Sequence, residues 1–266
     1  MKSIKINSKG SEVLLLQQLL NKKGYKVAED GDFGTKTQKA VISFQKDFGL
    51  VADGVVGNKT WEVILGKETP YFYLSEEDFQ ECADLLNVDV AAIKAVQEVE
   101  TGSNGGFFQE GKPSILFEGH VFWNQLIKVG KNPQDYLVGN DDILYKSWTK
   151  THYKGGMAEY DRLNKAMQID REAALSSASW GMFQIMGFNY SDCNCANINI
   201  FVDQMKQSAK SQLKLFTYFM LNHGYDKYLR SKNWAGFAKR YNGPGYALNQ
   251  YDVKLANAYL KYKKEA

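Results

Sequence analysis

The sequence has little cysteine and no long apolar run. Its three cysteines, Cys82, Cys193 and Cys195, are an odd number, which excludes a fully paired disulfide framework. We therefore expect free thiols in a reducing compartment. No run approaches the roughly 18 apolar residues that cross a bilayer, and no apolar stretch of signal-peptide length follows Met1. These absences predict a protein made in the cytoplasm, without stable insertion into a membrane.

The net charge is small, and histidine is scarce. A net charge of +3 over 266 residues gives no argument for a nucleic-acid partner. The three histidines form no helical His-x-x-x-His pair, which disfavours a metal-dependent amidase. We expect a monomer that holds neither a metal nor an organic cofactor. The length suits two domains, and an apolar fraction of 44% is enough to build a core in each.

The first 66 residues contain a short internal repeat. Residues 30–37 resemble residues 53–60, and each copy has an Asp-Gly turn, a second glycine and a threonine that could cap a helix. Apolar stripes at helical spacing cover residues 11–22 and 37–48, and a third stripe begins at Trp61. This pattern predicts three short helices joined by two matching turns.

A charged segment at residues 67–77 interrupts the pattern and is interpreted as a linker. Beyond it the chain has mostly helical periodicity with glycine-rich interruptions. Residues 87–101 predict a helix that Asn87 or Asp89 could cap. We expect the glycine-rich segment 102–106, directly after this helix, to form the edge of an active site.

Two glutamates near the end of this helix differ in their surroundings. On a helical wheel Glu98 lies on the solvent side and could pair with Lys94, whereas Glu100 lies inside the apolar arc. Burial and the negative end of the helix dipole both disfavour an ionised Glu100, so we expect its pKa to be raised. Such a carboxylic acid can protonate the leaving oxygen of a glycosidic bond. The alternative is a frayed helix end that faces water.

The N-terminal segment resembles a known wall-binding domain. Gly24-Tyr25, residues 30–37, residues 40–45 and residues 53–61 are similar to the peptidoglycan-binding domain found at one end of many cell-wall enzymes. The resemblance implies a three-helix domain at residues 1–66 that binds bacterial peptidoglycan. Most of its glycines need have no further role than to form the turns.

The remainder resembles the lysozyme-like superfamily. The motifs are Glu100-Thr101-Gly102, residues 179–186 and residues 240–245, in that order. Thr101 stands where that superfamily has a serine, which removes no catalytic group. Residues 95–102 and 113–122 resemble more closely the N-acetylmuramidases of phage and prophage endolysins. This resemblance implies a mostly helical, lysozyme-like catalytic domain at residues 78–266, and a mainly α protein overall.

The resemblance also implies roles for particular residues. Glu100 would be the general acid, and Glu118 would be a second carboxylate that acts as a base or an electrostatic stabiliser. An internal salt bridge or hydrogen bond is the alternative for Glu118. The residues expected to contact the substrate or to orient the carboxylates are Gln184, Tyr241, Asn242 and His120. Packing, edge or turn roles are their alternatives, and Trp180 suits the core as well as a sugar platform.

The implied activity is hydrolysis of the β-1,4 bond between N-acetylmuramic acid and N-acetylglucosamine, which leads to lysis of the host cell. A lytic transglycosylase that leaves anhydro ends is an alternative, because the superfamily shares its acid between both chemistries. A non-catalytic wall-binding protein and an injected antibacterial toxin are further alternatives. A phage endolysin of this kind would wait in the cytoplasm and reach the wall in the periplasm through a membrane pore.

Overall fold

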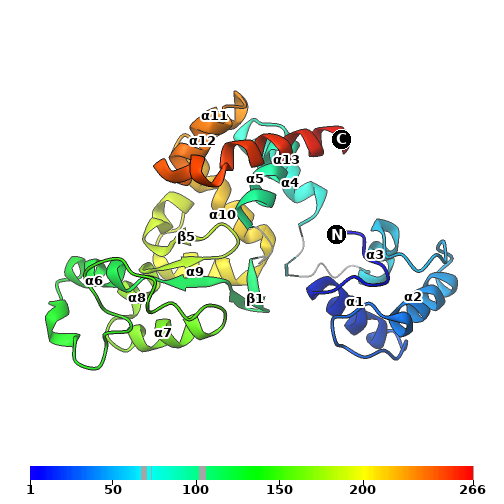
Figure 1. The fold of residues 1–266 in the computed structure, drawn as a ribbon, viewed down its shortest axis with the longest axis horizontal. Coiled ribbons are helices and arrows are strands. Elements are labelled where there is room, and N and C mark those ends of the chain that lie inside the picture. The colour runs from blue at the N-terminus through cyan, green and yellow to red at the C-terminus, as the bar shows by residue number, and fades with distance from the viewer. Residues whose placement is uncertain (67–70, 73, 102–105, 266) are drawn as a thin grey trace. The chain divides into compact units, whose positions relative to one another are not determined.

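The chain folds into two compact units. The computed structural model of the protein describes residues 1–66, 71–72, 74–101 and 106–265. The smaller unit comprises residues 1–70 and the larger unit residues 71–266 (Figure 1). Part of the predicted linker at 67–77 lies outside the described residues, and its last two residues, Glu76 and Glu77, belong to a helix of the larger unit.

The smaller unit consists of three short helices around one apolar core, which confirms the predicted arrangement. Its helices are α1 (Ser11–Lys22), α2 (Thr35–Asp47) and α3 (Asn58–Leu65). Each presents a buried apolar stripe to the others. The core contains Ile4, Val13, Leu16, Leu19, Leu20, Phe33, Val41, Phe44, Val56, Trp61 and Ile64.

A buried glutamine organises the first of the two matching turns. Gln17 Oε1 accepts hydrogen bonds from the backbone N–H groups of Asp30 and Gly31, at 3.1 and 2.9 Å. Gln17 Nε2 donates to Thr37 Oγ1 at 3.2 Å. Because Gln17 is 0% exposed, these contacts satisfy a side-chain amide that would otherwise be costly to bury.

Gln45 does the same for the second turn. Its Oε1 accepts from the Gly54 N–H at 2.9 Å, and its Nε2 donates to Thr60 Oγ1 at 3.2 Å. The prediction that the repeated threonines cap helices was wrong. Thr37 and Thr60 lie inside α2 and α3, a glycine occupies each N-cap position, and both hydroxyls are buried acceptors for the glutamines.

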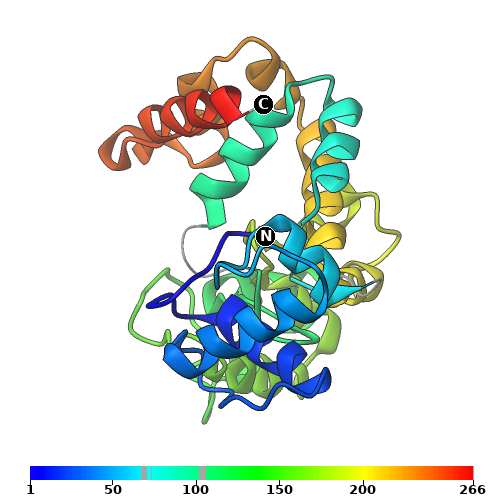
Figure 2. The same cartoon turned by 90° about the vertical axis from the view of Figure 1, so that its right-hand side faces the viewer.

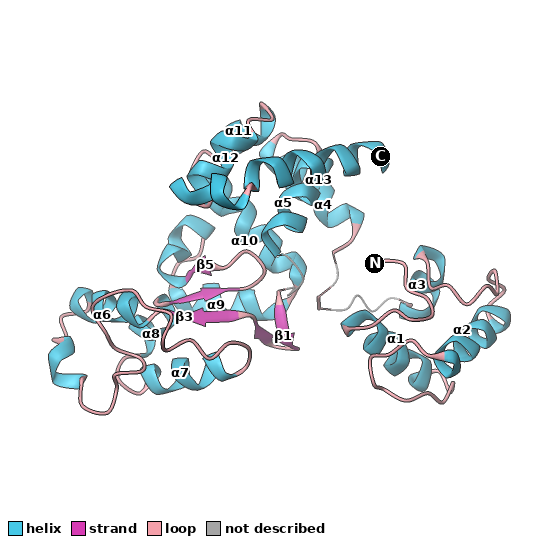
Figure 3. Ribbon diagram, in the orientation of Figure 1, coloured by secondary structure: helices cyan, strands magenta, loops and turns pink. Residues whose placement is uncertain are grey.

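The larger unit is mainly helical with two small sheets, which confirms the predicted fold class (Figure 3). Its α-helices are α4 (Glu76–Leu86), α5 (Val90–Thr101), α6 (Gly119–Lys128), α7 (Ala158–Met167), α8 (Arg171–Ser176), α9 (Ile198–Gln207), α10 (Ala209–Asn222), α11 (Asp226–Arg230), α12 (Trp234–Tyr241) and α13 (Tyr251–Glu265). Its 3₁₀ helices are η1 (Pro133–Tyr136), η2 (Gly187–Cys193) and η3 (Pro244–Asn249). None of the helices in the described ranges is long and apolar enough to cross a membrane.

The strands are very short and pair antiparallel. They are β1 (Phe107–Gln109), β2 (Lys112–Pro113), β3 (Ile115–Phe117), β4 (Ala178–Trp180) and β5 (Ile185–Met186). The first two form a ribbon, and the other three form a sheet in the order β3-β4-β5. Leu116 pairs with Ser179, which in turn pairs with Met186. One apolar core, which includes Phe117 and Trp180, joins this sheet to the surrounding helices.

Helix α5 packs against α4 and α13 (Figure 2). It begins at Val90, directly after Asp89, because Asn87 instead ends α4 in a left-handed conformation with φ of 52°. The face predicted to meet solvent is covered by α13. Glu98 forms an ion pair with Lys261 of α13 at 2.6 Å, and Lys94 forms one with a residue of α4, so the predicted pair between neighbours on α5 is replaced by contacts to other helices.

All three cysteines lie in the larger unit, and all three are buried and unpaired. Cys82 belongs to α4, Cys193 ends η2, and Cys195 follows it. The prediction of free thiols is confirmed.

Candidate active site

Glu100 lies in the last turn of α5, and its carboxylate contacts Asn242, the residue after α12. Asn242 Nδ2 donates to both carboxylate oxygens, at 3.2 and 3.1 Å. Burial raises the pKa of Glu100 to about 7, and the hydrogen bond from Asn242 opposes part of that rise. The protonated and ionised forms are therefore both populated near neutral pH, as a general acid requires.

Tyr241 connects the end of α12 to the turn between β4 and β5. Its ring stacks on Phe237 at 5.6 Å, and its hydroxyl donates to the carbonyl oxygen of Phe183 at 2.9 Å. Burial, together with the nearby Glu100 carboxylate, raises the pKa of Tyr241 well above its ordinary value. The hydroxyl thus stays protonated and holds the backbone next to Gln184.

Gln184 occupies the β4–β5 turn in a left-handed conformation, with φ of 48°. A non-glycine residue is uncommon there, and such positions gather at functional sites. Its Oε1 accepts from Ser179 Oγ at 2.7 Å, and its Nε2 donates to the Gly181 carbonyl at 2.8 Å. The side chain is exposed but oriented by the sheet, and none of its hydrogen bonds to described residues involves Glu100.

The side chains of Glu118, Ser179 and Gln184 lie on one face of the β3-β4-β5 sheet. Side chains alternate along an extended chain, and Glu118 keeps an extended conformation two residues after Leu116. Leu116 and its partner Ser179 therefore lie on the same face as Glu118, and Ser179 carries Gln184 with it through their hydrogen bond. Phe117 faces the opposite side and is fully buried.

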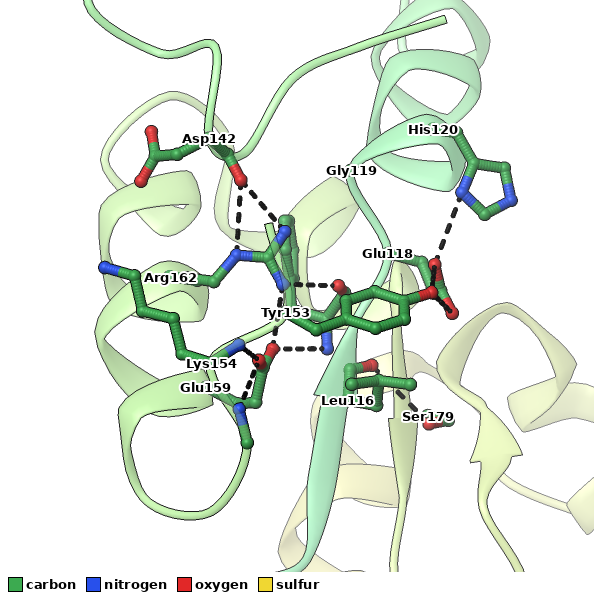
Figure 4. A network of polar contacts seen from close by, with 12 residues as sticks. Leu116, Glu118, Gly119, His120, Asp142, Tyr153, Lys154, Glu159, Arg162 and Ser179 are labelled. Carbon is green, nitrogen blue, oxygen red and sulfur yellow. Dashed lines mark hydrogen bonds and ion pairs between the residues drawn. The ribbon is translucent and has the colours of Figure 1, made fainter. Parts of the chain in front are cut away.

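The Glu118 carboxylate has two neighbours (Figure 4). The Tyr153 hydroxyl donates to Oε1 at 2.8 Å and to Oε2 at 2.7 Å. His120 Nδ1 lies 3.3 Å from Oε2, but the angles are not those of a hydrogen bond. Glu118 therefore has the internal hydrogen bonds that were the alternative to a catalytic role, and its side chain is 14% exposed.

Two organising residues could not be found from the sequence. Gln212 is fully buried in α10; its Oε1 accepts from the Met182 N–H at 2.8 Å, and its Nε2 donates to the Gly106 carbonyl at 3.0 Å. It thereby holds one end of the predicted glycine-rich edge, of which residues 102–105 lie outside the described residues. Tyr153 lies in a segment without regular periodicity, so no pattern marked it.

Other candidates have structural roles. Trp180 is 1% exposed and donates from Nε1 to the Leu175 carbonyl at 3.0 Å, so it belongs to the core and is no sugar platform.

A cavity of about 470 Å³ beside α6 is lined by Trp123, Tyr145 and His152, among others, and Glu100 is not one of its lining residues. In the described part of the chain, no three His, Cys, Asp or Glu side chains converge to hold a metal ion.

Known protein families match both parts of the chain. A family described as N-acetylmuramidase matches residues 89–263, and one described as putative peptidoglycan binding domain matches residues 9–64. The first match includes every residue of the candidate site. The second lies within the three-helix unit.

The chain is also similar to individual proteins. The crystal structure of the Burkholderia AP3 phage endolysin is 39% identical in sequence, with a TM-score of 0.70, and the match covers 99% of this chain and 100% of that one. The spore cortex-lytic enzyme of Bacillus cereus is 31% identical over 111 residues, which are 41% of this chain and 36% of that enzyme. The chain thus spans about a third of the length of the curated relatives it matches.

Proposed function

Because the chain belongs to the N-acetylmuramidase family and carries a peptidoglycan-binding domain at its N-terminus, we propose that it is an endolysin that cuts the glycan strands of peptidoglycan. The bond is the β-1,4 link between N-acetylmuramic acid and N-acetylglucosamine. The N-terminal domain holds the enzyme on the wall, and cleavage leads to lysis of the host cell after release through a membrane pore.

The general acid is Glu100. The observation that carries this assignment is a partly buried carboxyl whose pKa is raised to about 7 and whose two oxygens are oriented by Asn242. Its proton passes to the bridging oxygen as the sugar develops oxocarbenium character. Asn242 Oδ1 is buried without a hydrogen-bond partner among the described residues.

Glu118 is the second carboxylate, and it activates water or stabilises the positive charge that develops on the sugar. Its position on the same sheet face as Ser179 and Gln184 supports this role. His120, 3.3 Å from the carboxylate, helps to orient it, and Gln184 offers its exposed amide to the glycan. Tyr241 contributes by holding the turn that carries Gln184.

The decisive experiment is digestion of purified peptidoglycan, reduction of the products and mass spectrometry. Reduced muramic acid ends are expected from hydrolysis of the proposed bond. Anhydro-muramic ends would instead assign a lytic transglycosylase, and free peptides would show that the glycan is not the target.

The role of Glu100 is tested by Glu100→Gln, which keeps the shape of the side chain but has no acidic proton. We expect E100Q to lose about 100- to 10,000-fold of the rate, the range that a general acid contributes, and still to sediment with cell walls. Glu98→Gln, two residues earlier on the same helix, is the matched control and should keep its activity. A fully active E100Q would refute the assignment, whereas a wild type that binds walls without cutting them would indicate a binding protein.

A further inference from the structure

The hydroxyl that holds Glu118 comes from a long connection, not from a helix or strand. Tyr153 lies between η1 and α7, in a segment of turns and loops. A side chain on a loop positions a catalytic group reliably only when its own backbone is fixed. The contacts that fix this backbone converge on one buried ion pair, Glu159 with Arg162, in α7 (Figure 4).

Glu159 joins the two chain segments that carry Glu118 and Tyr153. Its Oε2 accepts from the backbone N–H of Phe117, the residue before Glu118, at 3.1 Å. Its Oε1 accepts from the N–H of Lys154, the residue after Tyr153, at 2.6 Å. A single carboxylate therefore sets the separation of the two backbones from which the hydrogen-bonded side chains extend.

Arg162 completes this anchor. Its Nη1 donates to Glu159 Oε2 and to the Phe117 carbonyl, both at 2.8 Å, and its Nη2 donates to the Asp142 carbonyl at 2.9 Å. Both side chains of the ion pair are 0% exposed. Burial alone would raise the pKa of Glu159, but its backbone donors and Arg162 outweigh it and lower that pKa, so the carboxylate remains ionised.

A buried ion pair is a weak source of stability, because desolvation of the two charges offsets their attraction. Here the ion pair contacts the backbone next to both Glu118 and Tyr153. These contacts indicate that the ion pair fixes the positions of those two residues. Tyr153 is suited to the same task. Burial and its hydrogen bond to Glu118 raise its pKa, so its hydroxyl keeps its proton and remains a donor.

We propose that Tyr153 is a positioning residue that fixes the Glu118 carboxylate through two hydrogen bonds, and that the Glu159–Arg162 pair anchors the loop that presents Tyr153. The inference rests on the proposed role of Glu118 in glycan cleavage. Without the hydroxyl, the flexible Glu118 side chain would spend less time in the reactive geometry. The loss should therefore appear in kcat more than in KM.

The test uses the full chain and soluble, uncrosslinked glycan strands, with kcat and KM measured separately. Tyr153→Phe should lower kcat about 10- to 100-fold and leave KM within about twofold. Tyr160→Phe is the matched control, because it also removes a hydrogen-bonding tyrosine hydroxyl, one that donates to the Pro113 carbonyl at 2.8 Å. Y160F should keep its kcat.

A double-mutant cycle separates positioning from simple destabilisation. If Tyr153 acts only through Glu118, then Y153F added to Glu118→Gln should cause no further loss, whereas a merely structural effect would be additive. Additive losses, or a Y153F variant as active as Y160F, would overturn the proposal. Loss of activity in E100Q with full activity in E118Q would also overturn it, while leaving the acid assignment intact.

A second variant covers the case in which Y153F does not fold. Glu118→Asp keeps the charge but draws the carboxylate back by one methylene, away from the Tyr153 hydroxyl, at a partly exposed position. Its kcat should fall about tenfold or more. Full activity of E118D would show that the position of this carboxylate is not critical, and would refute the role of Tyr153.

Discussion

Glu100 shows how two opposing contacts set the charge of one residue. Burial disfavours its carboxylate, while the N–H groups of Asn242 stabilise it, and the balance leaves the pKa at about 7. A fully unpartnered carboxyl would be protonated over a wider range, but it would not be oriented. Asn242 thus reduces the rise in the pKa of Glu100, and in return it orients the carboxylate.

Removing that amide therefore has a predictable sign. In Asn242→Ala the ionised form of Glu100 loses its donor, so its pKa rises and the acid stays protonated to higher pH. We expect the alkaline limb of the kcat–pH profile to move up by about one pH unit, even though the overall rate falls. Asn222→Ala, whose amide donates to the Asp192 carbonyl and not to Glu100, is the control and should leave the limb in place. A limb that stays or moves down in N242A would contradict this account.

At the residue level, the sequence was informative where the cause is local. The inward orientation of Glu100 follows from helical periodicity alone, because all the residues that define the arc lie within one helix. Asn242 could be connected to it only through a family resemblance, since 142 residues separate the two. The contact between Tyr153 and Glu118 could not be predicted from the sequence, because it depends on the path of a loop, and loop paths leave no periodic signal.

Among the helices, too, local features were predicted from the sequence and contacts between distant segments were not. Helix α1 was predicted at its observed bounds, and α2 within two residues, because short amphipathic stripes specify short helices. The surroundings of α5 were mispredicted. Its expected solvent face is covered by α13, from the far end of the chain, which supplies the partner of Glu98. Amphipathicity identifies a buried face, but it cannot say whether a polar face meets water or another helix.

Because a buried glutamine organises each of the two matching turns of the smaller unit, we expect replacement of either glutamine to have the same effect. Gln17→Ala and Gln45→Ala each leave backbone and threonine groups without their buried partner, so each should destabilise this unit by about 2–4 kcal/mol. Thermal unfolding followed by calorimetry would measure the loss, and kcat on soluble glycan should not change. The exposed neighbour Gln18→Ala is the control. Unaltered unfolding in Q17A or Q45A would show that the glutamines do not organise the turns.

For the molecule as a whole, the carboxyl that we propose as the general acid lowers stability at alkaline pH. Glu100 has a pKa of about 7 when folded, against an ordinary value of 4.5, so the folded state binds more protons than the unfolded state between these limits. Its favourable contribution is fully present below pH of about 4.5 and is lost as the pH rises through about 7.

It follows that E100Q should match the wild type in stability near pH 4 and exceed it by about 1–2 kcal/mol at pH 8, a figure reduced for partial exposure of the group. Urea unfolding at both pH values would measure the difference. Equal stability at pH 8 would mean that the carboxylate is better solvated than its burial implies. An active protein that is less stable than its inactive variant is the usual compromise of a functional site.

The placement of the three thiols has a practical consequence for following such transitions. Cys82, Cys193 and Cys195 are buried and all belong to the larger unit, whereas residues 1–70 contain no cysteine. A thiol-reactive dye can therefore modify the native chain only when the larger unit opens. It does not report on unfolding of the smaller unit. Labelling rates would report the opening of one unit in the intact chain, without any engineered probe.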